Sequence, residues 1–434
     1  MINLILLSGG SGSRLWPLSN SSRSKQFLKV IEDKNGNHVS MVQRVFDQIN
    51  KVDTELNITI ATSESQKDSI LRQISGDYSL TIEPERRNTA AAIMLACQHL
   101  SLEEHAKPED TVIVMPIDSY AEQEFYNNIL KIDKHVQSSE YDLVLQGVKP
   151  TCPSEKYGYI IPGELHGDVY DVLEFKEKPT ESLALEYIEK NGFWNCGIFG
   201  FRLSYLLDIT KRFFDSSKYL DYVENYSKLP SISFDYEVVE KAKRIGVVIY
   251  EGQWKDIGTW NELTGQMKEP HSGKVVYDQE TCSNTHVINE TNLPFVVAGL
   301  QDIIAVATPD GILVSDKKDS VNIKELVNKA AERQPMFEKK VWGEYRVLNA
   351  YEDSKGRRTS VVSIIVNKNQ NLISSNGEPF KKVCTVLMGK GKAKVSGKNY
   401  ELIPGTTLSI EKDCPYNITA SERLLILEAQ FWVL

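Results

Sequence analysis

The sequence has no histidine after His286, although it runs on to Leu434. Zinc sites of the imidazole type need histidine, so they are excluded from the last third of the chain. The six cysteines are scattered and never form a C-x-x-C pair, which excludes a cysteine zinc site and a dense disulfide framework. We therefore expect free thiols and a cytoplasmic location.

Long apolar runs and excess positive charge are also missing. No run approaches the roughly 20 residues that span a bilayer, and no basic, apolar and small-residue pattern marks a secretory signal at the start. The formal net charge of −9 argues against a general nucleic-acid binder. We expect no nucleic-acid or membrane partner, and 434 residues predict two or three domains.

The most informative segment begins where an apolar run, Leu4–Leu7, breaks into a loop of glycine and serine. Glycine lets the backbone approach a phosphate closely, and Arg14 and Lys25 follow as mobile positive charges. A tight turn without a ligand is the alternative. The preceding strand and the following cations favour phosphate binding. The candidate nucleotide-binding residues of the loop are Ser8, Gly9, Gly10, Ser11, Gly12 and Ser13.

This loop is neither of the two common phosphate loops. No Gly-Lys-Ser/Thr closes it, so a P-loop NTPase is disfavoured, and no third glycine stands at the dinucleotide-fold position of Gly10–Leu15.

Strand and helix candidates alternate from Met1 to about Trp260. Asn57–Ala61 and Thr111–Pro116 are typical of buried strands, and the alanine-rich Thr89–Leu100 between them is typical of a helix. The alternation predicts a doubly wound α/β domain with a mostly parallel sheet, which binds ligands beyond the carboxyl ends of its strands.

Composition changes after residue 268. We read His271–Lys274 as a linker, Asp310–Gly311 as a hairpin turn between short strands, and Asn322–Arg333 as a helix. Beyond Gln334–Pro335, short β-type runs broken by glycine predict a small barrel or sandwich. The expected domains are a nucleotidyltransferase domain at 1–268, a β-rich linker or assembly segment at 269–334 and a β-barrel at 335–434.

Two aspartates lie at positions suited to a metal. Asp118 follows the apolar run Val112–Met115, and Asp256 sits in the glycine-containing turn Trp254–Trp260. Such carboxylates hold Mg²⁺ (or Mn²⁺) that bridges phosphates. Taken singly, each aspartate is more often a solvated turn residue or a cap.

Together these motifs resemble the sugar-1-phosphate nucleotidyltransferases. The continuation of the glycine loop through Leu15–Leu18 and Lys25–Phe27 resembles the mannose-1-phosphate guanylyltransferases of the bifunctional bacterial type. The resemblance implies an α/β nucleotide-diphospho-sugar transferase (Rossmann-like) fold and Mg²⁺-dependent synthesis of GDP-mannose and pyrophosphate from GTP and mannose 1-phosphate. We also expect a homo-oligomer, namely a dimer. The catalytic residues that the resemblance implies are Arg14, Lys25, Asp118, Lys178 and Asp256, with Asp118 and Asp256 as metal ligands.

Further motifs occur in the order that this family uses. The decapeptide Glu83–Ala92 resembles the family's base-binding element, although Asn88 and Thr89 are also good helix caps. It supplies the remaining nucleotide-binding candidates Glu83, Arg87, Asn88 and Thr89. Four later motifs supply the sugar-binding candidates Tyr157, Gly158, Glu177, Asn195 and Asp235.

The tail resembles the cupin domain that carries phosphomannose isomerase activity in bifunctional relatives. Lys340–Leu348 and Leu427–Gln430 continue the resemblance, but Leu372–Phe380 lacks the histidines that the family clusters there. We expect a degenerate cupin-like barrel without isomerase activity that serves structure or assembly.

Two other functions stay open. Ser119 and Tyr120 stand where the family usually has histidine, so another hexose or heptose 1-phosphate remains an alternative substrate. A non-catalytic relative that binds GDP-sugar is the other alternative.

Overall fold

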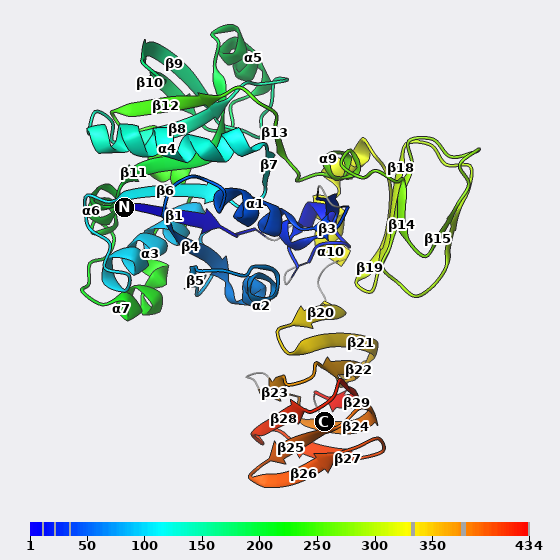
Figure 1. Ribbon diagram of the computed structural model, residues 1–434. Coiled ribbons are helices and arrows are strands. Elements are labelled where there is room, and N and C mark those ends of the chain that lie inside the picture. Colours follow the sequence, from blue (N-terminus) through cyan, green and yellow to red (C-terminus); the bar gives the residue numbers. More distant parts are fainter. Residues whose placement is uncertain (11–12, 21–22, 34–35, 331–334, 375–378, 433–434) are drawn as a thin grey trace. The chain divides into compact units, whose positions relative to one another are not determined.

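The computed structural model describes residues 1–10, 13–20, 23–33, 36–330, 335–374 and 379–432 (Figure 1). Several residues named in the predictions lie outside the described residues. They are Ser11, Gly12, the last three residues of the helix predicted at 322–333, Gln334 and Ser375–Glu378. The chain divides into two compact units. Unit 1 comprises Met1–Ser11, Ser24–Lys67 and Gln73–Met267, and unit 2 comprises Gly12–Arg23, Asp68–Arg72 and Lys268–Leu434. Within the described part of the chain, no helix is long and apolar enough to cross a membrane.

Unit 1 is built on a nine-stranded sheet. In spatial order its strands are β5 (Ser79–Glu83), β4 (Leu56–Ser63), β1 (Ile2–Leu7), β6 (Thr111–Pro116), β11 (Phe193–Arg202), β8 (Leu143–Val148), β12 (Ile245–Tyr250), β10 (Val169–Lys176) and β9 (Tyr159–His166). β5, β4, β1 and β6 run parallel, so their carboxyl ends share one edge of the sheet. The strands predicted at 57–61 and 111–116 are confirmed as β4 and β6.

The prediction of a mostly parallel sheet is wrong in the second half of unit 1. β11 runs antiparallel to both β6 and β8, and β9 and β10 form an antiparallel hairpin. Gly167–Asp168 lies between these two strands and is a recognised hairpin signal that the reading of strand–helix alternation passed over. A further pairing of β9 with β11 closes β11, β8, β12, β10 and β9 into a ring.

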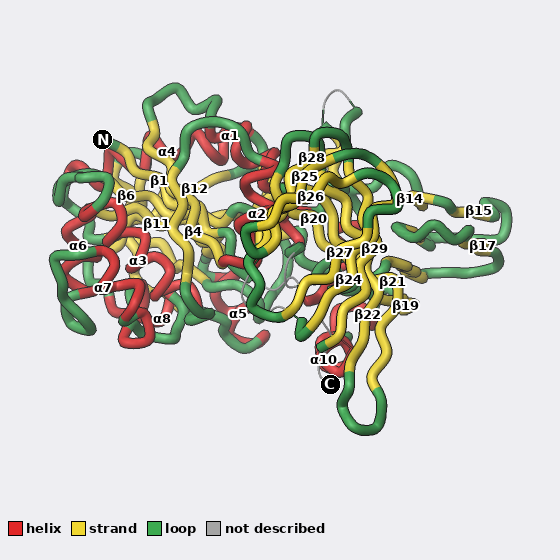
Figure 2. Tube along the Cα trace, turned by 90° about the horizontal axis from the view of Figure 1, so that it is seen from below, coloured by secondary structure: helices red, strands yellow, loops and turns green. Residues whose placement is uncertain are grey.

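Helices cover both faces of this sheet (Figure 2). The Phe199 and Phe201 rings on β11 pack against Phe234, whereas a Cβ at Gly200 would meet Ile132 on the other face. One face carries α3 (Asn88–Leu102), α6 (Leu203–Thr210), α7 (Tyr219–Glu224) and α8 (Phe234–Glu237), and the other carries α1 (Met41–Ile49) and α4 (Gln123–Ser138). The predicted alanine-rich helix is confirmed as α3, and its small buried side chains pack against β1, β4 and β5.

The remaining elements of the first 267 residues are short. They are η1 (Ser13–Leu15), η2 (Lys25–Phe27), β2 (Ile31–Glu32), β3 (His38–Val39), α2 (Glu64–Gln73), β7 (Ser119–Ala121), α5 (Glu181–Glu189), η3 (Tyr226–Lys228), η4 (Val239–Lys241), β13 (Trp254–Asp256) and α9 (Trp260–Thr264).

The first part of unit 2 is a short stack of parallel strands. β14 (His271–Gly273), β16 (His286–Asn289) and β18 (Ile303–Thr308) pair in parallel, as do β15 (Val275–Tyr277) and β17 (Phe295–Val297). The linker predicted at 271–274 is therefore wrong, because this polar segment finds its partner strand 16 residues along the chain, at His271↔Val287. The predicted hairpin is confirmed, since β18 pairs with β19 (Gly311–Asp316). η5 (Asp319–Asn322) and α10 (Lys324–Ala330) follow.

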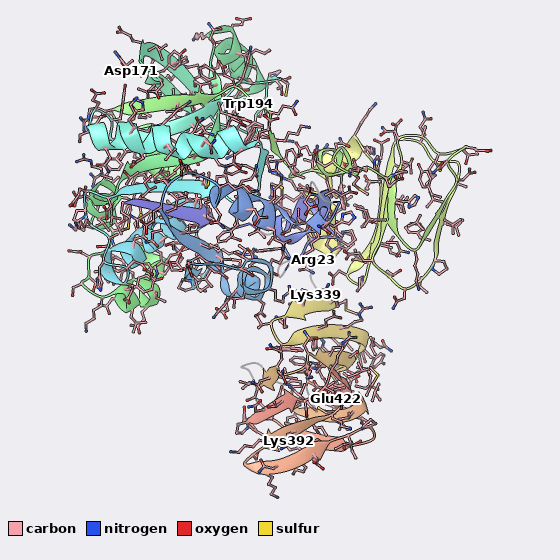
Figure 3. All side chains as sticks on the ribbon, in the orientation of Figure 1. Arg23, Asp171, Trp194, Lys339, Lys392 and Glu422 are labelled. Carbon is pink, nitrogen blue, oxygen red and sulfur yellow. The ribbon has the colours of Figure 1, made fainter. Side chains whose placement is uncertain are left out.

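The strand-rich segment 271–316 contacts residues that follow the glycine loop, and both parts of the chain belong to unit 2. Asp310 Oδ2 accepts a hydrogen bond from Asn20 at 2.7 Å, and Thr308 donates to Pro17 O at 3.1 Å. Arg23, which Figure 3 labels, forms an ion pair with Glu290 at 2.7 Å. Three separate contacts therefore hold Pro17, Asn20 and Arg23.

The rest of unit 2 is a β-barrel of two antiparallel sheets around one apolar core. One sheet has the order β20 (Phe337–Lys340), β21 (Gly343–Glu352), β22 (Arg358–Val366), β29 (Leu424–Phe431), β24 (Lys381–Met388) and β27 (Thr407–Glu411). The other has the order β23 (Asn371–Ile373), β28 (Tyr416–Ala420), β25 (Gly391–Val395) and β26 (Lys398–Leu402). Buried and exposed residues alternate strictly along β25 and β28, as expected when one face of a sheet is packed. The barrel predicted from the sequence is confirmed.

Candidate active site

A lysine bridges two carboxylates at the centre of the candidate site. The Nζ atom of Lys25 lies 2.9 Å from Asp118 Oδ2 and 2.6 Å from Asp256 Oδ1. Asp118 follows β6 at the carboxyl edge of the sheet, as predicted. Asp256 is the last residue of β13, whose antiparallel pairing with β7 sets Asp256 opposite Ser119. This small two-stranded sheet, which the sequence analysis missed, brings the two aspartates together.

The charges of this cluster are strongly coupled. Burial alone would lower the pKa of Lys25, but Asp118 and Asp256 together raise it above its ordinary value. Burial and the negative charge of Asp118 raise the pKa of Asp256, against the opposing effect of Lys25. Two carboxylates share one ammonium group, so the cluster has one excess negative charge when all three groups are ionised. Lys25 is therefore a partly buried member of an ionic cluster rather than a solvated surface charge.

Buried side chains hold the glycine loop after β1 in place. Ser8 N donates to Ala61 O at 2.8 Å, and Gln66 Nε2 donates to Gly10 O at 3.0 Å. Ser24 Oγ donates to the same carbonyl at 2.9 Å. Gly10 has a φ of 99°, and a Cβ at Gly9 or Gly10 would meet no atom within 4 Å. The loop therefore presents open backbone. No sequence signal indicated Gln66, which acts on it from α2.

The two cations predicted beside this loop have different surroundings. Lys25 begins η2 in unit 1 and makes the ion pairs described above. Arg14 is an exposed residue of η1, within unit 2. Ser13 begins the same 3-10 helix. Ser11 and Gly12 lie outside the described residues.

The proposed base-binding residues gather where β5 leads into α3. Glu83 Oε2 accepts from Tyr226 Oη at 2.8 Å, and burial raises the pKa of this glutamate. Arg87 Nε donates to Leu229 O at 3.1 Å, and Thr89 Oγ1 accepts from Phe234 N at 2.9 Å. Asn88 is exposed, with a φ of 68°. Arg87 occupies the N-cap position without a side-chain cap bond, whereas Asn88 Oδ1 accepts from the first-turn N–H of Thr89 at 2.9 Å, so the capping considered for Asn88 takes this local form.

The proposed sugar-binding residues form a second cluster. Asn195 Nδ2 donates to Asp235 Oδ1 at 2.8 Å, and the Asn195 backbone N–H donates to Gly158 O at 2.8 Å. Lys178 forms an ion pair with the buried carboxylate of Glu177. A Cβ at Gly158 would lie 2.6 Å from Glu177 Oε2, so the room that this glycine leaves is taken by the glutamate.

Burial and neighbouring charges shift the pKa values of side chains in this second cluster. Burial and then the charge of Glu177 raise the pKa of Asp235 to about 6. Burial would lower the pKa of Lys178, but the hydrogen bond and charge of Glu177 raise it overall. Acid groups with raised pKa values in polar clusters are frequent at functional sites.

Aromatic rings connect the two clusters. Tyr157 packs against Trp194, labelled in Figure 3, with ring centroids 4.8 Å apart, and against Trp254 at 5.3 Å. Trp254 lies two residues before Asp256 on β13. Burial, and then the negative charge of Asp256, raise the pKa of Tyr157. The aromatic cluster thus places the sugar-binding candidates beside the ionic cluster within unit 1.

The family model described as nucleotidyl transferase matches residues 3–272. The chain belongs to this family. Mannose-1-phosphate guanylyltransferase from Escherichia coli is 28% identical over 426 residues and covers 90% of each chain. Xanthan biosynthesis protein XanB from Xanthomonas campestris (strain ATCC 33913) is 31% identical over 398 residues, which are 85% of this chain and 82% of that protein.

A solved structure agrees with these relatives. The protein named mannose-1-phosphate geranyltransferase from Thermus thermophilus is 29% identical, covers 76% of this chain and 98% of its own, and has a TM-score of 0.61. The resemblance drawn from the sequence motifs is therefore confirmed, and so are the nucleotidyltransferase fold and the β-rich C-terminal region.

Proposed function

We propose that this protein transfers a guanylyl group from GTP to mannose 1-phosphate and releases GDP-mannose and pyrophosphate. The observation that carries the proposal is the Lys25–Asp118–Asp256 cluster at the carboxyl edge of the sheet where the open glycine loop emerges. The curated relatives named mannose-1-phosphate guanylyltransferase support the choice of base and sugar.

In this reaction an oxygen of the sugar phosphate attacks the α-phosphorus of GTP in line. The bond from the α-phosphorus to the bridging oxygen breaks, and pyrophosphate leaves with the electron pair. A phosphate dianion is already nucleophilic, so no protein base is needed, and catalysis rests on positioning and charge neutralisation. The Lys25 ammonium and the N–H groups of the loop supply that neutralisation, and Arg14 stays a further candidate cation on the family resemblance.

We assign Asp118 and Asp256 as ligands of Mg²⁺ (or Mn²⁺). Mg²⁺ is commonly bound through one or two carboxylates together with substrate phosphates, and the excess negative charge of the cluster suits a divalent cation. When bound, the ion neutralises phosphate charge. Both carboxylates contact Lys25, so the lysine and the metal share their ligands, and the ammonium must turn from them toward the nucleotide.

The sugar is assigned to the second cluster. Carboxylates and amides such as Glu177, Asn195 and Asp235 accept or donate hydrogen bonds to hydroxyl groups. Lys178 supplies a positive charge for the sugar phosphate. Glu83, Arg87, Asn88 and Thr89 remain the candidates for contacts with the base.

A panel of sugar 1-phosphates incubated with GTP tests this assignment. Mannose 1-phosphate should give the highest kcat/KM. A higher value for another hexose or heptose 1-phosphate would replace the substrate, and no product with any of them would leave a protein that only binds.

The barrel is assigned a structural role without isomerase activity. Its buried polar residues bond to one another: Glu428 accepts from Cys384 Sγ at 3.0 Å and from Gln430 Nε2 at 2.7 Å. Lys382 Nζ donates to Tyr416 Oη at 2.9 Å. These bonds stabilise the barrel interior. The unpaired cysteines support a cytoplasmic setting for the enzyme.

Two copies associate through the parallel strands of unit 2. Val276 and Val296 are neighbours in register on β15 and β17, and their side chains are 62% and 69% exposed. Ile312 and Val314 on β19 are exposed as well. Neighbouring exposed apolar side chains such as Val276 and Val296 mark interaction surfaces, and a second copy of the chain is the partner proposed for the face of β15 and β17.

A further inference from the structure

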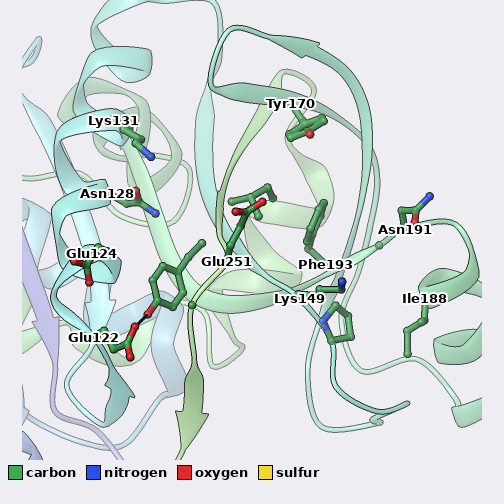
Figure 4. Close-up of a pocket in the computed structure, with 15 residues that line it drawn as sticks. Glu122, Glu124, Asn128, Lys131, Lys149, Tyr170, Ile188, Asn191, Phe193 and Glu251 are labelled. Atoms are coloured by element: carbon green, nitrogen blue, oxygen red, sulfur yellow. Dashed lines mark hydrogen bonds between the residues drawn. The ribbon is translucent and has the colours of Figure 1, made fainter.

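Unit 1 contains a pocket that shares no residue with the candidate active site. It has a volume of about 810 Å³ and is lined by residues of α4, β10, β11 and β12 and of the segments that follow α5 and β8 (Figure 4). This volume lies within the range of about 300–1,000 Å³ that is typical of small-molecule sites. The pocket can therefore hold a ligand independently of the reaction.

One polar side chain in this pocket, Asn128, is free to bind a ligand. Asn128 is only 4% exposed, and its amide makes no hydrogen bond with any residue that the structure describes. Figure 4 shows Asn128 projecting from α4 on the same side as Lys131, toward β12. The Asn128 amide is not among the fully enclosed polar atoms that lack a partner, so it stays open to the pocket and offers two donors and one acceptor to a ligand.

Aromatic rings line the other side of the pocket. Tyr170 on β10 and Phe193 on β11 have ring centroids 6.4 Å apart and lie across from α4 in Figure 4. Flat apolar ring faces combined with a planar amide suit a sugar ring, which has apolar C–H faces and a rim of hydroxyl groups.

The charges of the lining select against anions. Glu122, Glu124 and Glu251 contribute three carboxylates, whereas Lys131 and Lys149 contribute two ammonium groups. The lining is thus net negative, unlike a site for a nucleoside triphosphate or a sugar phosphate. Carboxylates instead accept hydrogen bonds from neutral hydroxyl groups.

We propose that this pocket is a binding site for a neutral oligosaccharide, distinct from the site for the sugar 1-phosphate. Asn128 hydrogen-bonds hydroxyl groups of the ligand, and Tyr170 and Phe193 pack against its ring faces. The proposal does not depend on guanylyl transfer, and binding is measured without GTP.

Isothermal titration of the full-length protein with α-1,2-mannobiose and with maltotriose tests the site. The expected result is saturable binding of at least one of them, weakened at least about tenfold by Asn128→Leu and by Phe193→Ala, since each removes a direct contact. Asn127→Leu is the matched control, because Asn127 is exposed on the same helix, outside the lining, and only accepts from Gln123. It should leave binding unchanged, and melting curves establish that the variants are folded.

Further arms separate this site from the candidate active site. Asp235→Asn should leave saccharide binding unchanged. If this variant no longer bound the saccharide, the saccharide would bind in the candidate active site instead. No saturable binding of either saccharide would overturn the proposal. Binding of mannose 6-phosphate or GTP that depends on Asn128 would overturn the neutral class of ligand.

Discussion

Lys25 Nζ lies 2.6 Å from Asp256 Oδ1, although the two residues are 231 positions apart in the sequence. Asp118 holds the same ammonium group from the other side at 2.9 Å. The three side chains come from η2, the end of β6 and β13, so the cluster forms only when the sheet of unit 1 is assembled. This arrangement joins the phosphate-binding and metal-binding assignments in one ionic cluster.

Lys25→Met should lower kcat/KM by about 30- to 1,000-fold, which corresponds to about 2–4 kcal/mol of transition-state stabilisation. The physical reason is the loss of the positive charge that we propose turns from Asp118 and Asp256 to the phosphates. Lys176→Met is the matched control, because Lys176 is half-exposed and, among the described residues, its ion pair is with Glu240, a contact worth less than about 1 kcal/mol. Steady-state kinetics with both variants measures the difference. A Lys25 variant as active as the control would remove this lysine from the mechanism.

Chelation of divalent ions with EDTA should abolish product formation, and added Mg²⁺ or Mn²⁺ should restore it. Asp256→Asn should raise the Mg²⁺ concentration needed for half-maximal activity and lower kcat, because it removes one of two carboxylate ligands. Asp208→Asn, at an exposed aspartate on α6, should change neither quantity. Full activity in excess EDTA would contradict the metal assignment.

The raised pKa of Asp235 predicts a pH-dependent stability. Its ordinary value is 3.8 and burial beside Glu177 raises it to about 6, so the folded state binds this proton more tightly than the unfolded state. Stability contributed by the protonated form is lost as pH rises from about 4 to about 6, by up to about 3 kcal/mol. Asp235→Asn has no such loss. Urea unfolding of both proteins between pH 4 and pH 8 should therefore show curves that diverge across this window. Parallel curves would mean that Asp235 titrates normally.

The apolar face of β15 and β17 predicts the assembly state. Val276→Lys combined with Val296→Lys should halve the mass in solution, because two charges would be buried in the interface. Leu173→Lys on β10 is the control, since Leu173 is 73% exposed and lies in unit 1. Light scattering after size exclusion reports the mass. An unchanged dimer in the double variant would place the interface elsewhere.

Local signals in the sequence were sufficient for the parallel half of the sheet. The glycine loop after Leu7, the helix after Arg87 and the position of Asp118 follow from apolar runs, small residues and strand ends. The β9–β10 hairpin also had a local signal, Gly167–Asp168, but strand–helix alternation was given more weight than the turn.

The pairing of strands that are far apart in the chain could not be predicted from local sequence signals. Nothing near Asp256 indicates that β13 pairs with β7, and nothing near His271 indicates its parallel partner at Val287. The hydrogen bonds from Gln66 to the glycine loop and from Cys384 to Glu428 likewise depend on the tertiary fold. The sequence could therefore name the residues of the ionic cluster but not their direct contact through Lys25.

Pyrophosphate release from GTP and mannose 1-phosphate by the purified full-length protein, in the presence of Mg²⁺, tests the central claim most directly. The account predicts equimolar GDP-mannose and pyrophosphate with the wild-type protein and a large loss of both with Lys25→Met. Bound GTP with no pyrophosphate above the background without protein would contradict it.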